Sequence, residues 1–286
     1  MIVWKTFRRL ILLEQTLFGL PWAFAGAILP LAIPNTPLLA FGPLQWLFIV
    51  LAFFFARTAG MSFNRLIDRK IDGDNPRTRM RVLPSGEATP LQVGVLAWTA
   101  AAGFVVTCGL INMPILLLSP LLLLLLIGYS YTKRFTSLCH FVLGAIQFFV
   151  PICAWIAITG VWAWPPVFLG LAALTLFAGT DIVYQMQDLS FDKKRGLVSL
   201  PVVLGIEKSM TFVRLLHIAS ITCLVALSFF LSHAIIYLVG VGCIATIFLY
   251  MHWKLSLHSY EVGRFFFRCN TLVGVSAFII CIGALL

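Results

Sequence analysis

Long, uninterrupted runs of apolar residues recur along this chain and limit its possible folds more than any other feature of the sequence. Each run has about 20 residues, the length with which one α-helix crosses the ~30 Å hydrocarbon core of a bilayer. Of the 286 residues, 61% are hydrophobic and 10% are charged, so the chain lacks the polar surface of a soluble globule. We therefore expect a polytopic membrane protein whose solvent is the lipid bilayer.

The apolar runs predict an all-α fold, with about nine transmembrane helices in one bundle and a single domain over residues 1–286. The predicted spans are residues 10–33, 44–64, 92–111, 114–131, 139–160, 165–187, 212–231, 234–253 and 268–286. Almost loopless turns, at Met113-Pro114 and Ser232-His233, leave eight or ten spans as alternatives. A cleavable signal peptide is disfavoured because the first apolar run continues to Ile33. The segments near residues 65–91 and 188–211 are expected to form helical or irregular caps over the bundle.

Among the connections between the predicted spans, only every second one carries lysine or arginine. The connections near residues 34–43, 111–114, 160–165 and 231–234 contain neither residue. Because positive residues stay on the cytoplasmic side of a membrane, we expect a cytoplasmic N-terminus, and both caps on the cytoplasmic face of the inner membrane. The same placement accounts for the net charge of +10, so the expected partner is the lipid bilayer and no nucleic acid.

The acidic residues are few and clustered at the ends of the second and sixth predicted spans. Six of the ten fall in two short segments: Asp68, Asp72 and Asp74, then Asp181, Asp188 and Asp192. A charged side chain costs roughly 2.5–3.5 kcal/mol within a bilayer, so acids that face a helix bundle usually have a function. Both segments lie on the expected cytoplasmic side, where they would face each other across one site.

The spacing within each segment places oxygen-bearing side chains on one helical face. In the first segment the oxygen-bearing residues follow one another at steps of four, and in the second at steps of three, four and four. The sets are Asn64, Asp68 and Asp72, then Asp181, Tyr184, Asp188 and Asp192. Carboxylate and amide oxygens suit a hard cation such as Mg²⁺, and the lack of neighbouring Cys or His disfavours zinc. The predicted metal ligands are Asn64, Asp68, Asp72, Asp181, Asp188 and Asp192.

Basic residues beside these acids favour a bound diphosphate. Arg77, in the first cap, has a guanidinium that can bind phosphate oxygens in a bidentate manner, and Lys193 follows the second acidic set. The plain alternative is a solvated face on which the acids pair with neighbouring Arg and Lys. Repetition of the same spacing on the same side favours a site.

The residues of both segments resemble the UbiA superfamily of intramembrane prenyltransferases. The resemblance covers essentially the whole chain and rests on two blocks. The first runs from Asn64 through Asp68 and Asp72 to Asn75-Pro-Arg-Thr78 and Leu83-Pro-Ser-Gly86; the second runs from Asp181 through Asp188 and Asp192 to Gly196-Leu-Val-Ser199-Leu-Pro201. A shorter match, from Tyr129 to Thr136, resembles the 4-hydroxybenzoate polyprenyltransferases of that superfamily.

The resemblance implies Mg²⁺-dependent transfer of a polyprenyl group from a polyprenyl diphosphate to an aromatic acid. It implies catalytic roles for the carboxylates of Asp68, Asp72, Asp188 and Asp192, without deciding which one is the general base. The residues expected to bind the substrates are Arg57, Asn64, Arg77, Tyr131, Lys133, Arg134, Tyr184 and Lys193. Tyr131 and Tyr184 are candidates to stabilise an allylic cation by cation–π attraction. The five histidines show no ligand spacing and are interpreted as interfacial or packing residues.

Arg57 precedes Asn64 by seven residues, which places it two helical turns deeper on the same face. It is expected either to receive the carboxylate of the aromatic acid or to pair with Glu14. The expected acceptor is of the 4-hydroxybenzoate type, in ubiquinone biosynthesis, with a dihydroxynaphthoate of menaquinone biosynthesis as the alternative. A haem-modifying relative is less favoured, and so is an ion-coupled transporter, because the acids lie at one membrane face.

Overall fold

The structure is a computed structural model that describes residues 2–39, 41–257 and 262–286, without the side chains of residues 14–17, 256–257 and 262–264. All regular structure in these residues is helical. The helices are α1 (Trp4–Ile11), α2 (Leu13–Ile28), η1 (Leu29–Ala32), α3 (Pro43–Asp74), α4 (Pro90–Ile111), α5 (Met113–Thr132), α6 (Cys139–Thr159), α7 (Pro165–Gln185), η2 (Met186–Asp188), α8 (Leu189–Arg195), α9 (Leu200–Leu227), η3 (Ser228–Phe230), α10 (Ala234–Leu257) and α11 (Val262–Gly283). The all-α prediction is confirmed.

Eight helices in the described part of the chain are long and apolar enough to cross a membrane. They correspond to the second to ninth predicted spans. The first predicted span is shorter than expected, because Leu12 adopts a left-handed conformation (φ 51°) that separates α1 from α2. Leu10 and Ile11 of α1 pack beside Val82 and Ala88 of the first cap, so α1 turns toward the cap and α2 with η1 forms a shorter apolar helix.

Local signals in the sequence set several helix boundaries. Proline occupies the first position of α3, α4 and α7, where its missing N–H costs nothing. A capping box begins α4, in which Thr89 and Gln92 each accept a hydrogen bond from the other residue's backbone N–H, at 3.2 and 2.9 Å. Gly160, with φ 73°, ends α6. The described connections are therefore short.

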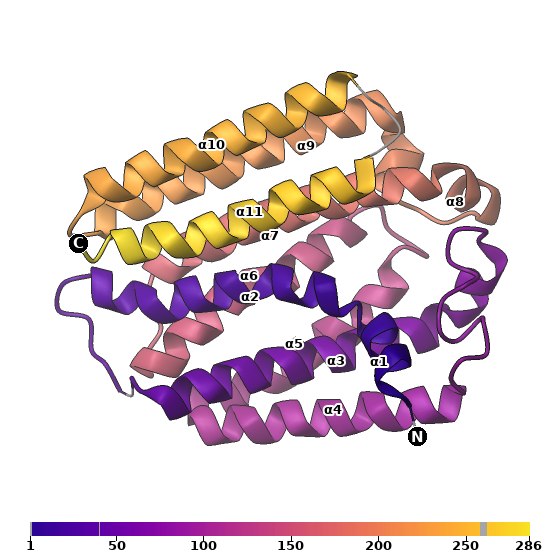
Figure 1. Ribbon diagram of the computed structural model, residues 1–286, viewed down its shortest axis with the longest axis horizontal. Coiled ribbons are helices and arrows are strands. Elements are labelled where there is room, and N and C mark those ends of the chain that lie inside the picture. The colour runs from indigo at the N-terminus through magenta and orange to yellow at the C-terminus, as the bar shows by residue number, and fades with distance from the viewer. Residues whose placement is uncertain (1, 40, 258–261) are drawn as a thin grey trace.

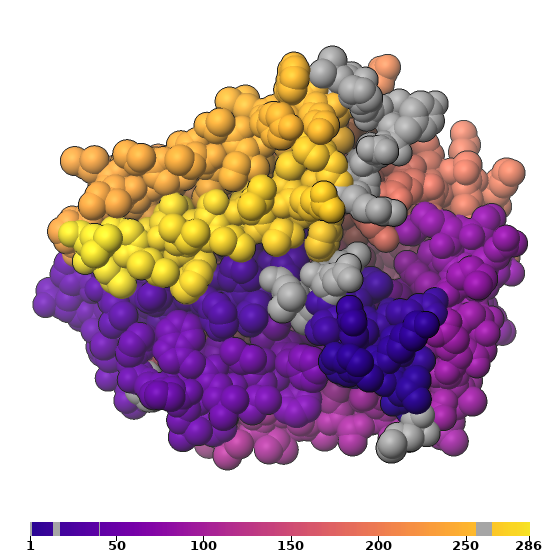
Figure 2. Space-filling view, viewed as in Figure 1, coloured from indigo at the N-terminus to yellow at the C-terminus, as the bar shows by residue number. Residues whose placement is uncertain are grey.

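Helix α7 lies in the middle of the bundle, in contact with α6, α9, α11 and α2 (Figure 1). Of its most apolar 18-residue stretch, 61% is buried, against 22% for α5. Helices α3, α4 and α5 pack together on one side, and α10 and α11 lie side by side on the other (Figures 1 and 2). Most residues in this stretch of α7 are therefore buried by other parts of the protein.

Both caps lie at the end of the bundle that carries α8 (Figure 1). Helix α3 continues ten residues beyond its predicted end, to Asp74, so the non-helical part of the first cap is residues 75–89. The second cap is mostly helical, formed by η2, α8 and the start of α9, where Gly205 (φ 75°) breaks the helical path. The backbone N–H of Val198 donates to the carbonyl of Lys133 at 2.8 Å, which ties the second cap to the end of α5.

Glycine allows the backbones of α2, α6 and α7 to approach closely. A Cβ atom at Gly26 of α2 would lie 2.2 Å from the carbonyl oxygen of Pro151 in α6. One at Gly144 of α6 would lie 2.7 Å from the carbonyl oxygen of Leu174 in α7. Neither backbone atom can move aside as a side chain can, so these contacts require glycine, as is common between membrane helices.

We expect Gly26→Ala to lower the thermal stability of the detergent-solubilised protein, because the new methyl group would push α2 from α6. Overpacking of this kind costs about 1–3 kcal/mol. Gly94→Ala in α4 is the matched control, since no atom lies within 4 Å of its Cβ position, and it should leave stability unchanged or slightly raised. Equal melting temperatures for Gly26→Ala and the wild type would contradict the close approach.

Candidate active site

A cavity of about 350 Å³ extends from the two caps into the bundle. Its cap end is polar and its deeper wall is apolar. The polar end includes Asn64, Asp68, Asp72, Arg77, Lys133, Tyr184, Asp188 and Asp192, and the deeper wall includes Ile49, Phe104, Ile115, Cys153 and Ala157. The structure thus brings both acidic sets together at the mouth of one apolar cavity.

Asp68 is buried at this mouth and is surrounded by donors from α3 and α5. The side-chain amide of Asn64 donates to its Oδ2 at 3.0 Å and also to the hydroxyl of Ser130 at 3.2 Å. Lys133 Nζ lies 3.7 Å from Oδ2, and Arg134 Nη2 lies 3.3 Å from Oδ1. Two cations therefore compensate a carboxylate that is 3% exposed.

Asp72, one turn further along α3, pairs with the first cap. Arg81 Nη1 donates to its Oδ1 at 2.7 Å, and Thr78 donates to its backbone carbonyl at 2.9 Å. The other oxygen, Oδ2, is buried without a hydrogen-bond partner among the described residues, and Arg65 Nη1 lies 3.9 Å from it. This oxygen is open to a further ligand.

Asp188 joins the second acidic set to the first cap. Arg77 binds it with both Nε, at 2.7 Å, and Nη2, while Asn75 donates to Oδ1 at 2.9 Å. The Arg77 guanidinium also donates to the Tyr184 hydroxyl at 3.0 Å and lies 4.9 Å from the centre of that ring. Burial acts to lower the pKa of Arg77, but the hydrogen bonds and charge interactions with Asp188 and Tyr184 together outweigh it and raise the pKa. Arg77 is a fixed cation at the mouth.

Asp192 lies one turn beyond Asp188, on α8. Its side chain accepts a hydrogen bond from the amide of Gln185, and its backbone carbonyl accepts one from Leu197 N–H at 3.0 Å. The second set does not follow one continuous α-helix, because the 3₁₀ turn η2 separates α7 from α8. All four of its members nevertheless line the cavity.

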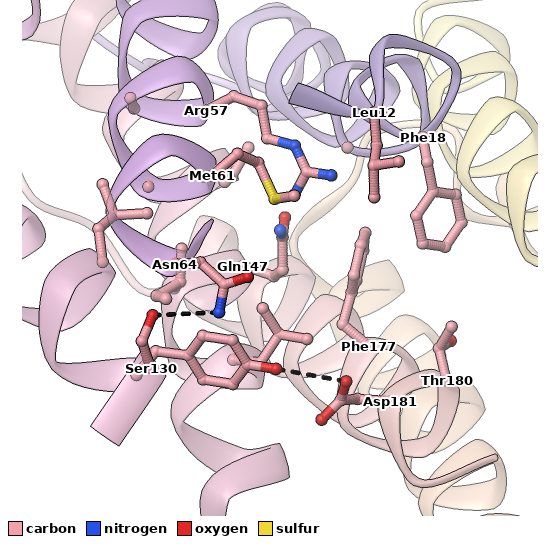
Figure 3. A pocket seen from close by; sticks show the side chains of 18 of the residues that line it. Leu12, Phe18, Arg57, Met61, Asn64, Ser130, Gln147, Phe177, Thr180 and Asp181 are labelled. Carbon is pink, nitrogen blue, oxygen red and sulfur yellow. Dashed lines mark hydrogen bonds between the residues drawn. The ribbon is translucent and has the colours of Figure 1, made fainter. Parts of the chain in front are cut away.

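Asp181 lies deeper and has different partners. Its Oδ2 is 2.7 Å from Nδ1 of His140, and its Oδ1 accepts a hydrogen bond from the Tyr129 hydroxyl at 3.4 Å (Figure 3). The interpretation of His140 as an interfacial or packing residue is therefore incomplete, because this histidine forms a buried polar link between α6 and α7. Its sequence spacing gave no sign of this contact.

Arg57 and Gln147 also line the deeper cavity (Figure 3). Arg57 Nε and Gln147 Oε1 are both buried without a hydrogen-bond partner among the described residues. The alternative pairing of Arg57 with Glu14 falls on a side chain outside the described residues. A cation and an amide with unused capacity thus face one cavity.

Three of the predicted substrate-binding residues do not line the cavity: Tyr131, Arg134 and Lys193. Tyr131 is 44% exposed and stacks under the guanidinium of Arg134 at 5.1 Å. Lys193 is exposed on α8. Arg134 still contacts the site through Asp68. Contacts that the sequence interpretation did not assign come from Asn75, Arg81, Tyr129, His140 and Gln147.

The polar end fits Mg²⁺ in its chemistry. Its ligand atoms are carboxylate and amide oxygens, and the unpaired Oδ2 of Asp72 is available. Within the described residues, no three His, Cys, Asp or Glu side chains form a metal-sized cluster. This suits Mg²⁺, which usually takes one or two carboxylates and completes its shell with water and substrate phosphate oxygens.

The sequence and the fold both have relatives among known proteins. A 4-hydroxybenzoate octaprenyltransferase from Aliivibrio salmonicida is 31% identical over 250 residues, with 80% of each chain covered. Another, from Tolumonas auensis, is 29% identical over 275 residues, covering 96% of this chain and 91% of the relative.

Solved structures have the same architecture. The apo structure of a UbiA homolog from Aeropyrum pernix K1 superimposes with a TM-score of 0.82 at 26% identity, covering 96% of this chain and 98% of the other. A UbiA homolog from Archaeoglobus fulgidus bound to DMAPP and Mg²⁺ shares the fold, with a TM-score of 0.74 at 18% identity, covering 98% of this chain and 99% of the other. Residues 19–278 match the UbiA prenyltransferase family, and the chain therefore belongs to that family.

Proposed function

We propose that this membrane-embedded prenyltransferase transfers a polyprenyl group from a polyprenyl diphosphate to an aromatic acid of the 4-hydroxybenzoate type, as a step of ubiquinone biosynthesis. The observation that carries the proposal is one cavity with two chemically different ends. Acids and cations from both caps meet at its mouth, and on its deeper wall lies Arg57, whose Nε has no hydrogen-bond partner among the described residues. The likeness to 4-hydroxybenzoate octaprenyltransferases over most of the chain supports it.

The mouth is the proposed diphosphate site. Asn64, Asp68 and Asp72 on one side, and Asp188 and Asp192 on the other, would hold separate Mg²⁺ ions together with phosphate oxygens, and the bound ions would supply positive charge to the departing diphosphate. Arg77 and Lys133 are the cations best placed to bind phosphate oxygens directly, because both line the cavity and both already face carboxylates. In the absence of substrate these cations neutralise the acids. When the diphosphate binds, Arg77 and Lys133 would therefore exchange carboxylate partners for phosphate oxygens, and Mg²⁺ would neutralise the carboxylates instead.

The deeper wall is the proposed acceptor site. Arg57 has free hydrogen-bonding capacity for a carboxylate, and its burial makes an incoming anion strongly favourable. In the reaction, a ring carbon of the acceptor forms a bond to the allylic carbon as the carbon–oxygen bond to diphosphate breaks. The electron pair leaves with the diphosphate, and the ring proton passes to a base. Tyr184, at the mouth, presents an aromatic face near the developing cation.

The remaining wall is suited to an apolar chain. Residues of α3, α4, α5 and α6 line it with side chains that carry no charge, among them Ile49, Phe104, Ile115 and Ala157. A polyprenyl group gains about 25 cal/mol for each Å² of apolar surface that it buries.

We further propose that residues 1–286 act as one prenyltransferase domain whose caps face the cytoplasm from the inner membrane. Both caps, which carry basic residues such as Arg77 and Lys193, lie at one end of the bundle (Figure 1), and Lys133 contacts the second cap through its backbone carbonyl. This is the arrangement that the positive-inside rule predicts for a cytoplasmic face. Arg9 donates to the backbone carbonyl of Met80 at 2.8 Å, so α1 and the first cap share this side. A polyprenyl diphosphate would then meet the site from the cytoplasmic leaflet.

We expect the purified protein to prenylate 4-hydroxybenzoate when supplied with a polyprenyl diphosphate and Mg²⁺, and to lose activity when the metal is removed with EDTA. Asp68→Asn should reduce turnover roughly 10²-fold, because it removes a proposed ligand charge. Asp74→Asn is the matched control, since Asp74 pairs with Arg195 outside the cavity. Prenyl transfer to a dihydroxynaphthoate but not to 4-hydroxybenzoate would contradict the proposed acceptor. Transfer to neither acid would contradict the proposed prenyltransferase function.

We expect Arg57→Ala to raise the KM for the aromatic acid roughly ten- to a hundredfold, the effect of losing a hydrogen bond to a charged group. The KM for the polyprenyl diphosphate should stay unchanged in the same variant. Arg69→Ala, an exposed arginine on the same helix, serves as the control. An unchanged KM for the aromatic acid in Arg57→Ala would exclude the carboxylate role.

A further inference from the structure

His140 is fully buried at the start of α6, where it contacts two other parts of the protein and does not itself line the cavity. Its Nδ1 lies 2.7 Å from Oδ2 of Asp181 on α7. Its Nε2 accepts a hydrogen bond from the backbone N–H of Leu200, at 3.3 Å. Leu200 is the first residue of α9 and lies in the second cap, which also carries Asp192. His140 thus connects a carboxylate on the cavity wall to the base of the second cap.

The contact with Leu200 determines which imidazole nitrogen carries the proton toward Asp181. A backbone N–H only donates, so Nε2 must offer a lone pair. The proton therefore sits on Nδ1 and is directed at the Asp181 carboxylate. Rotation of the imidazole would break both contacts. Water does not reach this site directly to replace them, because His140 is 0% exposed.

Asp181 retains unused hydrogen-bonding capacity on the cavity side. A carboxylate has about four acceptor positions, and among the described residues His140 and Tyr129 each occupy one. The Asp181 side chain is 13% exposed and lines the cavity. His140, which is not in the lining, and Tyr129, which is, thus hold the carboxylate from two sides, while its side chain still lines the cavity (Figure 3).

The position of Asp181 separates it from the diphosphate end. It precedes Asp188 by seven residues, which corresponds to about 10 Å along a helix axis. Oxygen ligands lie only about 2.0–2.1 Å from Mg²⁺, so Asp181 and Asp188 are poorly placed to share an ion. Arg57 likewise precedes Asn64 by seven residues on α3. Arg57 and Asp181 are therefore both two turns deeper than the polar mouth.

We propose that His140 is a positioning residue which, through its Nδ1–H, orients Asp181 to accept a hydrogen bond from the hydroxyl group of the aromatic acceptor. Asp181 then belongs to the acceptor half of the site and is not a metal ligand. This inference rests on the proposed function. A phenolic acid offers a carboxylate to Arg57 and a hydroxyl to Asp181, so the two residues together select acceptors that carry both groups.

A purely structural role for His140 makes a different prediction. Helices α6 and α7 already approach closely at Gly144 and Leu174, independently of the His140–Asp181 contact. If His140 only joined these helices, its loss would lower stability and affect both substrates together. If His140 positions Asp181, its loss should lower kcat/KM for the aromatic acceptor and leave the KM for the polyprenyl diphosphate unchanged.

The experiment compares His140→Ala, His140→Gln and Asp181→Asn with the wild type, and uses His233→Ala, an exposed histidine, as the control. Steady-state kinetics are measured for 4-hydroxybenzoate and for the polyprenyl diphosphate. Binding of inorganic diphosphate with Mg²⁺ is measured by calorimetry, which needs no acceptor. Thermal unfolding in detergent verifies that each variant is folded.

We expect His140→Ala and Asp181→Asn to lower kcat/KM for 4-hydroxybenzoate about ten- to a hundredfold, as loss of an orienting partner does elsewhere. The KM for the polyprenyl diphosphate and the Mg²⁺-dependent binding of diphosphate should not change. His140→Gln should recover most of the activity, because its amide can donate to Asp181 and accept from Leu200.

Weakened diphosphate binding in folded Asp181→Asn would restore Asp181 to the metal site and overturn the inference. So would normal kinetics in His140→Ala, or no recovery in folded His140→Gln. In each of these cases a wild type that prenylates 4-hydroxybenzoate leaves the proposed function intact. A wild type that binds Mg²⁺ and diphosphate but prenylates no aromatic acid would overturn the proposed function, and this inference with it.

Discussion

Buried carboxylates at one end of an apolar bundle are the constraint on which the rest of the site depends. Asp68, Asp72 and Asp188 are each 6% exposed or less, and a buried charge without a partner is costly. Their partners come from elsewhere in the chain: Lys133 from the end of α5, and Arg77 and Arg81 from the first cap. The same ion pairs that compensate these acids therefore hold both caps over the cavity and place at its mouth the cations that we propose bind phosphate.

The division of the cavity into a charged mouth and an apolar interior follows from the direction of the helices. Helices α3 and α7 both run toward the caps. On either path, a residue seven positions earlier in the chain therefore lies about two helical turns deeper in the cavity. Asn64 and Asp188 lie at the mouth, whereas Arg57 and Asp181 lie deeper. The two substrates that we propose, one with a charged head and a long apolar chain and one with an acid group, would therefore find separate surroundings within one cavity.

The sequence predicted the helices well, because a span needs a long apolar run and each run is visible without tertiary information. It also placed Asn64, Asp68 and Asp72 on one face, since α3 continues unbroken. It did not predict the break at Leu12, which depends on contacts with the distant first cap. Tyr131 and Lys193 do not line the cavity because each directly follows a lining or buried residue, and neighbours on a helix point about 100° apart. The partnership of His140 and Asp181 spans 41 positions, and no local pattern could indicate it.

The glycine contacts also determine which parts of the bundle can move. Helices α2, α6 and α7 meet through backbone atoms, at Pro151 and Leu174, so displacing one of them displaces the others. On the opposite side of the cavity, Gly60 of α3 faces the side chain of Leu126 in α5, and Gly103 of α4 faces that of Phe55 in α3, and side chains can change rotamer. We therefore expect α3, α4 and α5 to shift against one another more readily than α2, α6 and α7, the last of which carries Asp181.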